Sequence, residues 1–391
     1  METQQNIIEQ LKKSFRENST HSESEIVVRS PGRINLIGEH TDYNEGFVLP
    51  SAIDKAIYLL VTPRDGFSAG LFSLDFDDVH SFDVRSPLKT TKEWANYLIG
   101  VVDQMKKLGR NIGGFDCHFA GNIPIGAGMS SSAALETGFA FALNGLFGLG
   151  LDRKELARIG QKSENEFVGV KCGIMDQFAS VLSKGNSALL LDCRSLSYEL
   201  IPFTRTDLKF LLCDTGVKHS LAASEYNLKR EQCETGVEVI KKRFSSIRSL
   251  RDVDEDKLEE CRDGMEPVVY KRCKFVLDEN SRVQSGRLRL TEDDYGGFGK
   301  LMYASHDGLK NMYEVSCEEL DFLVDTASSI DGILGSRMMG GGFGGCTLTL
   351  LENGHVEEFN KRVSETYLKH FGRIPKIYEC SLMPGTSIIE D

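Results

Sequence analysis

The stretch GNIPIGAGMSSSAA, residues 121–134, makes a strand, a glycine-rich turn and a helix follow one another directly. Residues 115–120 have the pattern of a strand that runs into the turn. A helix comes next, because apolar residues recur on one helical face at Leu135, Phe139, Leu143 and Leu146. Glycines allow a close approach to a ligand, and the first N–H groups of the helix point outward with its positive dipole end. The segment therefore suits a polyphosphate, with serine hydroxyls available to phosphate or magnesium.

The same segment has a simpler interpretation. No Gly-Lys-Ser/Thr follows the glycines, so it is not a Walker A loop. An ordinary N-capped helix after a loop would show the same pattern, and this segment alone leaves both interpretations open.

A second polar segment, PGRINLIGEHTDYNEGFVLP at residues 31–50, lies between predicted strands at 25–30 and 56–62. The first of these strands is expected to end at Pro31-Gly32. The segment concentrates acidic, basic and imidazole groups: Arg33, Glu39, His40, Asp42, Asn44 and Glu45. Sugar hydroxyls donate and accept hydrogen bonds, so carboxylates beside an imidazole can bind a pyranose ring directionally. A solvated loop whose charges pair with one another is the alternative.

Asp176, in the apolar setting GIMDQF, is a candidate general base. In phosphoryl transfer a carboxylate can orient the attacking hydroxyl and accept its proton. Arg33 could hold that carboxylate ionised and offset charge in the transition state. Glu164, twelve positions earlier, is a plausible magnesium ligand if its helix faces the glycine-rich turn. By itself, Asp176 could equally be a helix N-cap.

Strands and helices alternate along the chain. We expect an amphipathic helix near the N-terminus, with Ile8, Leu11 and Phe15 on one face. Asp152 is the predicted cap of a helix that reaches about Phe167. The other predicted segments are helices at 94–107 and 222–244, strands at 187–192 and 208–214, an acidic irregular stretch at 250–265, a helical part up to about 330, a second glycine-rich stretch, MMGGGFGGCTLTLL, and a closing strand in IPKIYECSL.

Length and charge limit the class of protein. A chain of 391 residues favours two domains, expected at 1–195 and 196–391, with the final strand able to pair back onto the first. The formal net charge of -12 repels nucleic acid and anionic membranes. Ten scattered cysteines without a C-x-x-C pair indicate reduced thiols. We therefore expect a cytoplasmic protein, acting as a monomer, without nucleic-acid or membrane partners.

Taken together, the motifs resemble the galactokinase family of the GHMP kinase superfamily. GRINLIGEHTDYNEGFVLP resembles the family's sugar signature, IPIGAGMSSSAA its phosphate loop and GSRMMGGGFGGC its third motif. KCGIMDQF and VKHSLAASEYNLKREQCE add to the likeness, which extends from about residue 25 to 385. The resemblance implies an α+β fold of two lobes, the first like domain 2 of ribosomal protein S5 and the second ferredoxin-like. It also implies that ATP, with Mg²⁺, phosphorylates the C1 hydroxyl of galactose.

The resemblance also implies roles for individual residues. Arg33 would stabilise the transition state and Asp176 would be the catalytic carboxylate. The residues implied to bind galactose are Glu39, His40, Thr41, Asp42, Gly173 and Tyr226. Those implied to bind ATP are Gly126, Ala127, Gly128, Met129, Ser130, Ser131, Ser132 and Trp94, with Ser132 and Glu164 serving the metal. Trp94 could instead be a core residue, and Gly340 to Gly345 would buttress the phosphate loop.

Two departures and two rival functions remain. Met129 stands where the family more often has Leu, which nearly conserves volume, and Met339 stands where Thr is familiar, so one polar contact is in doubt. The first rival is a kinase for a related sugar, N-acetylgalactosamine or arabinose. The second is a sensor on the same fold that binds galactose and ATP without turnover, although Ser130, Ser131, Ser132 and Asp176 are all present.

Overall fold

A long strand, β3 (Pro50–Arg64), runs through the middle of the N-terminal lobe. Its side chains alternate between two covered faces. Ile57, Leu59 and Val61 belong to the main core, whereas Tyr58 and Leu60 pack with helix α1 (Gln4–Asn18) on the opposite face. A strand buried on both faces needs apolar side chains on both, and residues 56–61 of β3, AIYLLV, supply them. The computed structural model describes residues 3–19, 25–124, 126–217 and 222–390.

A six-stranded sheet is built around β3, in the order β13-β1-β3-β6-β4-β5. Only the β4–β6 pair is parallel. The other strands of this sheet are β1 (Ile26–Asn35), β4 (Ser68–Ser73), β5 (Asp78–Asp83), β6 (Gly114–Gly121) and β13 (Ser387–Ile388). The hairpin of β4 and β5 was not predicted from the sequence.

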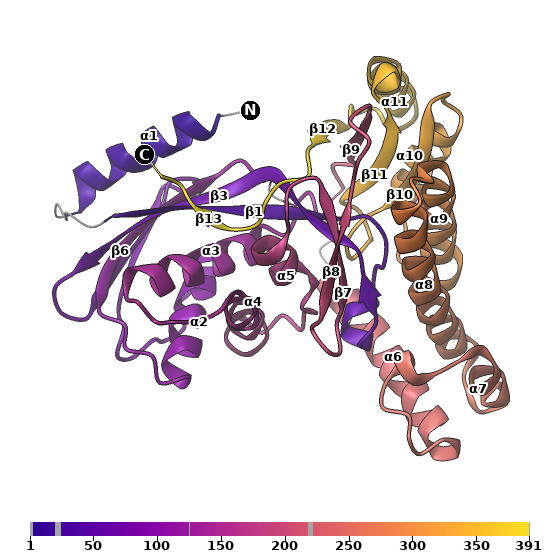
Figure 1. Cartoon of the computed structure of the whole chain (residues 1–391), viewed down its shortest axis with the longest axis horizontal. Coiled ribbons are helices and arrows are strands. Elements are labelled where there is room, and N and C mark those ends of the chain that lie inside the picture. Colours follow the sequence, from indigo (N-terminus) through magenta and orange to yellow (C-terminus); the bar gives the residue numbers. More distant parts are fainter. Residues whose placement is uncertain (1–2, 20–24, 125, 218–221, 391) are drawn as a thin grey trace.

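The sheet has helices on both faces (Figure 1). Helix α1 covers one face through Ile7, Leu11 and Phe15, so the predicted amphipathic N-terminal helix is confirmed. The other face carries α2 (Glu93–Lys107), α3 (Ser131–Leu146), α4 (Arg153–Lys162), which continues as the π-helical turn η2 (Ser163–Val168), and α5 (Met175–Leu182). Asp152 caps α4 as predicted, in a reciprocal capping box with Glu155.

The predicted end of the first strand at Pro31-Gly32 is wrong, because β1 continues to Asn35. The register with β3 shifts between Pro31 and Arg33, so the proline falls at a bulge instead of ending the pairing. This continuation carries Arg33 along the sheet toward the other lobe.

The C-terminal lobe contains a four-stranded antiparallel sheet in the order β10-β11-β9-β12. Helices α9 and α10 pack on β10. The strands are β9 (Leu208–Asp214), β10 (Ile333–Met338), β11 (Cys346–Glu352) and β12 (Lys376–Cys380). The helices are α6 (Ala222–Arg243), α7 (Glu255–Glu260), α8 (Pro267–Thr291), α9 (Tyr295–Gly308), α10 (Glu318–Ser328) and α11 (Val356–Phe371). Short helical turns are η1 (Asp42–Asn44), η3 (Leu250–Asp252), η4 (Arg262–Gly264), η5 (Leu309–Tyr313) and η6 (Asn353–His355).

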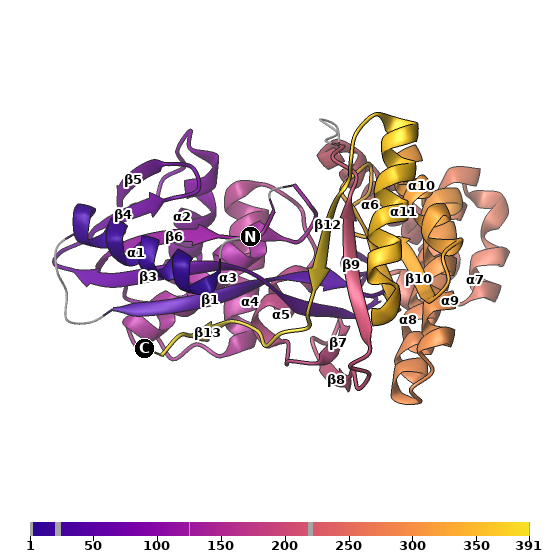
Figure 2. The ribbon, with the colours of Figure 1, turned by 90° about the horizontal axis from the view of Figure 1, so that it is seen from above.

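The two lobes lie side by side, and the chain returns from the second to the first at its end (Figure 2). There β13 pairs with β1, with Ile388 opposite Val28. A small sheet of β2 (Phe47–Val48), β7 (Ser187–Asp192) and β8 (Tyr198–Pro202) forms its own layer. Its β7–β8 hairpin straddles the boundary predicted at residue 195.

The acidic stretch 250–265 is more ordered than expected. It contains η3, α7 and η4, with Asp254 capping α7 and Leu258 fully buried. The prediction of an irregular segment was wrong because a few apolar anchors and side-chain caps outweigh the excess of surface charge.

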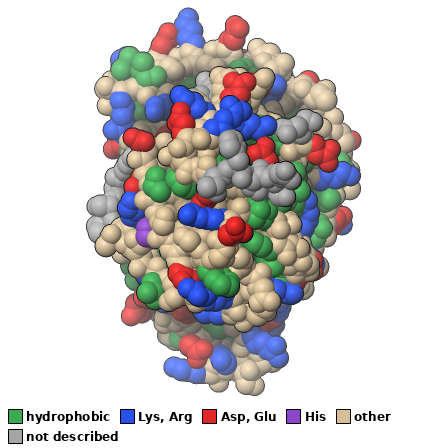
Figure 3. All heavy atoms as spheres, turned by 90° about the vertical axis from the view of Figure 1, so that its left-hand side faces the viewer, with side chains coloured by type: hydrophobic (Ala, Val, Ile, Leu, Met, Phe, Trp, Pro, Cys, Tyr) green, Lys and Arg blue, Asp and Glu red, His purple; other side chains and the backbone are tan. Residues whose placement is uncertain are grey.

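The surface at the outer end of the N-terminal lobe intersperses cationic and anionic side chains (Figure 3). In the described part of the chain, no helix is long and apolar enough to cross a membrane. All ten cysteines lie within the described ranges, and each is a free thiol.

Candidate active site

The glycine-rich turn ends in a serine whose backbone is left-handed. Ser130, at the N-cap of α3, has φ 58° and ψ 55°, and its hydroxyl forms no capping hydrogen bond to the helix. It donates instead to Asp176 Oδ2. A left-handed backbone is costly for a residue with a Cβ and is typical of functional turns. The first-turn N–H groups of α3 therefore have no side-chain cap from Ser130, as an anion site at a helix N-terminus requires.

Arg33 and Asp176 form a two-pronged ion pair. Arg33 Nε donates to Oδ1 at 2.8 Å and a terminal nitrogen donates to Oδ2 at 2.9 Å, while the other terminal nitrogen donates to the Gly128 carbonyl at 2.5 Å. Only 6% of the Arg33 side chain is exposed, against 29% for Asp176. Burial acts to lower the pKa of Arg33, but the carboxylates around it outweigh burial and raise that pKa. The arginine thus joins the glycine-rich turn to the carboxylate.

Asp176 does not cap its helix. The N-cap of α5 is Ile174, and Asp176 lies in the first helical turn. The simpler interpretation of this aspartate as an N-cap is therefore wrong, and its carboxylate is instead shared between Arg33 and Ser130.

A cavity of about 400 Å³ opens beside this ion pair. Both lobes contribute to its wall. The residues that line it are Arg33, Glu39, His40, Asp42, Gly169, Val170, Cys172, Gly173, Met175, Asp176, Tyr226, Asn227, Gly340, Gly341 and Gly342. The structure therefore brings together, in one cavity, seven of the eight residues predicted to bind sugar or catalyse, among them Tyr226 from α6.

Glu39 is held from the C-terminal lobe. Its Oε1 accepts a hydrogen bond from the Gly340 N–H at 2.9 Å and lies 3.2 Å from a terminal nitrogen of Arg337. Arg337 is fully buried at the end of β10 and also donates to the Asn35 carbonyl at 2.9 Å. Sequence reasoning missed Arg337. The signal was present, since the arginine of GSRMMGGG, separated from the glycines by two methionines, is a charge inside a buried strand.

The Asp42 carboxylate lies in close contact with Gly173. A Cβ on Gly173 would collide with the Asp42 carboxylate, so any other residue there would have to displace that carboxylate. Burial, and then the charge of Asp176, raise the pKa of Asp42 to about 7. Near neutral pH this carboxyl group can therefore both donate and accept hydrogen bonds.

Ser132 and Glu164 lie where the first turn of α3 meets η2. The Ser132 hydroxyl donates to Glu164 Oε1 at 3.3 Å, and burial followed by the charge of Asp176 raises the pKa of Glu164 to about 7. Hydroxyl and carboxylate oxygens suit Mg²⁺, which takes its remaining ligands from phosphate and water. Among the described residues, no group of three or more His, Cys, Asp or Glu side chains could hold a metal ion.

Four predicted site residues point away from the cavity. Thr41 is fully buried and donates to backbone carbonyls of Gly38 and Phe47. Trp94 is half-buried, donates to Asp78 at 3.0 Å and packs against Phe119. Ala127 and Met129 lie in the core.

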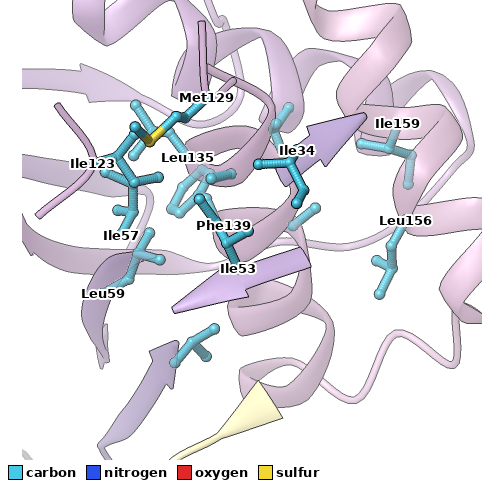
Figure 4. Packing of buried hydrophobic residues seen from close by; sticks show 14 of the residues in the cluster. Ile34, Ile53, Ile57, Leu59, Ile123, Met129, Leu135, Phe139, Leu156 and Ile159 are labelled. Atoms are coloured by element: carbon cyan, nitrogen blue, oxygen red, sulfur yellow. The ribbon is translucent and has the colours of Figure 1, made fainter. Parts of the chain in front are cut away.

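Met129 fills the core beneath the turn, beside Ile123 and Leu135 (Figure 4). Its carbonyl accepts the Arg33 N–H at 3.1 Å. Gly32 allows this approach, since a Cβ there would fall 2.6 Å from the same carbonyl. Met129 therefore supports the turn from below, while the exposed Gly126 and Gly128, both with positive φ, shape its outer side.

The third motif lies against the turn. The two backbones approach each other closely: a Cβ added to Gly128 would lie 3.9 Å from the Met339 carbonyl oxygen, and one added to Gly340 would lie 4.0 Å from the Gly128 carbonyl oxygen. The sulfur of Met339 accepts the Asn35 N–H at 3.5 Å, so a polar contact persists without the hydroxyl of threonine. Of the motif VKHSLAASEYNLKREQCE, residues 218–221 lie outside the described residues, as does Ile125 in the phosphate loop.

Models of known families match three parts of the chain. They are the GHMP kinases N-terminal domain at residues 96–184, the galactokinase galactose-binding signature at 13–63 and the GHMP kinases C-terminal domain at 289–369. A solved structure of Methanococcus jannaschii mevalonate kinase shares the fold, with a TM-score of 0.62 and 20% identity over 93% of this chain and all of that one.

Closer relatives share more of the sequence. The galactokinase of Roseiflexus sp. strain RS-1 is 40% identical over 94% of this chain and 93% of its own, and that of Thermosipho africanus is 40% identical over 93% and 99%. The crystal structure of Lactococcus lactis galactokinase complexed with galactose has a TM-score of 0.94 and 34% identity, covering 98% of this chain and 100% of that one. This chain therefore belongs to the galactokinase family of the GHMP kinases.

Proposed function

We propose that this chain transfers the γ-phosphoryl group of ATP to the C1 hydroxyl of galactose, giving galactose 1-phosphate and ADP. The observation that carries the proposal is the Arg33–Asp176–Ser130 cluster, which joins a helix N-terminus suited to phosphates to a cavity of sugar size. The Lactococcus lactis relative, solved with galactose, supports the choice of sugar.

Asp176 orients the attacking hydroxyl and accepts its proton as the phosphoryl group moves. Arg33 keeps this carboxylate in place with two hydrogen bonds and supplies positive charge beside the transferred group. Phosphoryl transfer leaves little covalent chemistry to the protein, so positioning and charge stabilisation carry most of the rate.

The sugar is held by other residues that line the same cavity. Glu39, anchored by Arg337 and the Gly340 N–H, offers carboxylate oxygen, and Asp42 both donates and accepts near neutral pH. His40 and Tyr226 add a second, aromatic wall. Such paired donors and acceptors distinguish the hydroxyl pattern of one sugar from that of another.

ATP is placed on residues 126–132, with its phosphates at the N–H groups of α3. Ser132 and Glu164 would hold magnesium, which would supply positive charge against the phosphates. A magnesium requirement, a monomeric state and a cytoplasmic location belong to the same proposal.

The test is ADP release from ATP and magnesium by the purified protein, with galactose, glucose, N-acetylgalactosamine and arabinose in parallel. We expect turnover with galactose and a loss of about 10²-fold or more in Asp176→Asn, with galactose binding retained in calorimetry. Faster turnover of another sugar would overturn the substrate. Galactose binding without ADP release would favour the sensor, and near-normal turnover of Asp176→Asn would remove that residue from the chemistry.

A further inference from the structure

The loop from Gly38 to Phe47, which we name the cavity loop, carries part of the cavity wall. Glu39, His40 and Asp42 lie on this loop and line the cavity. Its regular structure is the short turn η1. Gly38 and His40 have left-handed backbones, with φ 105° and 62°. The shape of such a segment depends on the contacts that hold its backbone groups, because helix or sheet bonding supplies few of them.

Thr41 closes the cavity loop from within. Its hydroxyl lies 2.9 Å from the Gly38 carbonyl and 2.6 Å from the Phe47 carbonyl, and donates to them. The Thr41 carbonyl accepts the Gly46 N–H at 2.8 Å. The two ends of the loop therefore lie side by side, and their carbonyl groups share one donor. The N–H groups of the same two end residues bond to the other lobe.

Two consecutive residues of α8, in the C-terminal lobe, hold these N–H groups. The Gly38 N–H donates to Glu279 Oε1 at 2.9 Å, and the Phe47 N–H donates to Asn280 Oδ1 at 2.8 Å. Gly46 makes room for the second contact, since a Cβ there would collide with Asn280 Oδ1. One helix of the C-terminal lobe therefore fixes both ends of the cavity loop.

The Glu279 carboxylate is itself held by other groups. Glu279 is fully buried, and its Oε1 also accepts the Ser305 hydroxyl of α9 at 2.7 Å. Oε2 accepts Arg282 Nε at 2.6 Å. A buried carboxylate is costly unless it is paired and hydrogen-bonded, and these contacts meet both conditions. The acceptor for the Gly38 N–H is therefore fixed in place before any ligand binds.

Asn280 uses one half of its amide group for the loop. Its Oδ1 accepts the Phe47 N–H, whereas Nδ2 is buried without a hydrogen-bond partner among the described residues. A buried donor without a partner costs free energy, so packing alone would favour an apolar side chain at this position. The bond to Phe47 accounts for the amide, because it needs an oxygen at this place and nothing more.

The two contacts concern the sugar side of the cavity. Glu39 follows Gly38 directly, and Arg337 of the C-terminal lobe contacts its carboxylate. Arg33 and Asp176, in contrast, pair with each other within the N-terminal lobe. A loosened cavity loop should therefore weaken sugar binding more than it slows phosphoryl transfer.

We propose that Glu279 and Asn280 are positioning residues for the sugar, and that they act by holding the Gly38 and Phe47 N–H groups so that the cavity loop keeps its binding shape. Neither residue touches the sugar in this proposal. The inference rests on the proposed function for the identity of the sugar, but the order of the loop is a property of the free protein.

Two substitutions of Asn280 test the proposal in kinetics. Asn280→Leu removes the acceptor with little change in volume, and should raise the KM for galactose by roughly 5- to 10-fold, as loss of one hydrogen bond predicts, with little change in kcat. Asn280→Asp restores an oxygen at the same place and should recover most of this loss. A merely structural role would not give a loss confined to KM that an acceptor rescues.

Substitutions of Glu279 test the other end of the loop. Glu279→Met removes the acceptor for the Gly38 N–H and should raise the KM in the same way, with a larger loss of stability because Arg282 loses its partner. Glu279→Gln keeps an oxygen for Gly38 and should raise the KM less. If Glu279→Met does not fold, the two Asn280 variants decide the question.

Hydrogen–deuterium exchange of the sugar-free protein, followed by mass spectrometry, reports on the loop directly. Peptides that cover residues 38–47 should exchange at least tenfold faster in Asn280→Leu than in wild type or in Asn280→Asp, because a lost hydrogen bond lets the loop open more often. Asn144→Leu is the matched control. Asn144 Oδ1 accepts the Leu151 N–H at 2.9 Å after α3, so this variant loses a bond of the same kind and should leave the loop and the KM unchanged.

The outcomes separate the proposal from its alternatives. Unchanged KM and unchanged exchange in Asn280→Leu would overturn it, as would an equal loss in Asn280→Asp or a fall in kcat at constant KM. Faster exchange with an unchanged KM would also overturn it, because the loop would then move without cost to sugar binding. If the wild type releases no ADP with galactose, the proposed function fails, while exchange and calorimetric binding of galactose still test these two residues.

Discussion

Ser130 donates its hydroxyl hydrogen to Asp176, although its position at the N-cap of α3 would normally commit that hydroxyl to the helix. This contact orders the glycine-rich turn and the carboxylate as one unit, and leaves the helix N-terminus to a ligand. The left-handed backbone of Ser130 makes the arrangement possible. The strain at this residue is therefore linked to the chemistry of the site.

Two substitutions at Ser130 separate the hydroxyl from the backbone. Ser130→Ala and Ser130→Gly both remove the hydrogen bond to Asp176, so both should lower kcat by about tenfold, as loss of a charge-assisted hydrogen bond predicts. Glycine adopts positive φ without strain, so the free energy of unfolding of Ser130→Gly should exceed that of Ser130→Ala by about 1 kcal/mol. Urea titration checks this order. Equal stability of the two variants would mean that the backbone is not strained.

The fork of Arg33 leads to a second prediction. Lysine keeps the charge but cannot make both hydrogen bonds to Asp176 and the bond to Gly128, so Arg33→Lys should lower kcat/KM by on the order of 10²-fold. Arg64→Lys is the control, because Arg64 makes a single hydrogen bond to Asp116 at 3.3 Å and is partly exposed. Unchanged kinetics in Arg33→Lys would leave Arg33 with a purely structural role.

The sequence predicted those parts of the site that lie close together in the chain. Arg33, Glu39, His40 and Asp42 fall in one polar segment, and glycines followed by serines mark the turn before α3. A binding or catalytic segment of this kind can be recognised from the local sequence, since few structural roles need those residue types together. The fold class was also predictable, because the motifs resemble those of a family whose fold has two α+β lobes.

Partners distant in the chain were not predictable in the same way. Arg337 contacts Glu39, which is 298 positions away in the sequence, and no local pattern around either residue predicts this contact. Thr41 lies in the polar segment, yet its hydroxyl donates to the backbone carbonyls of Gly38 and Phe47, a local bond that threonine side chains commonly make in turns. The β4–β5 hairpin was missed since its strands are short, with an exposed outer edge and weak apolar alternation.

The close contact of Gly173 with Asp42 gives a third prediction. A methyl group at position 173 would collide with the Asp42 carboxylate and push it into the cavity, so Gly173→Ala should raise the KM for galactose by tenfold or more, on the order of a lost charged hydrogen bond. Gly354→Ala is the matched control, since a Cβ there meets no atom within 4 Å. An unaltered KM in Gly173→Ala would show that Asp42 can move without cost to binding.

The raised pKa of Asp42 predicts a pH-dependent stability. Burial and the charge of Asp176 raise this pKa from 3.8 to about 7, so between these values the folded protein holds a proton that the unfolded chain has released. Stability therefore falls as pH rises from about 4 to about 7, and changes no further from this group above its folded pKa. Asp42→Asn removes that contribution, since an amide does not titrate.

Urea unfolding of the ligand-free protein at pH 5 and pH 8 checks this sign. Relative to wild type, Asp42→Asn should be more stable at pH 8 than at pH 5, that is, the difference in unfolding free energy between variant and wild type should be more positive at pH 8. Asp83→Asn is a suitable control, because the lowered pKa of this exposed carboxyl group, paired with Arg85, leaves it ionised in both the folded and the unfolded chain at pH 5 and at pH 8, so the relative stability of this variant should be the same at both. The same relative stability of Asp42→Asn at both pH values would mean that Asp42 is ionised in the folded protein throughout this range, and that its surroundings solvate the charge.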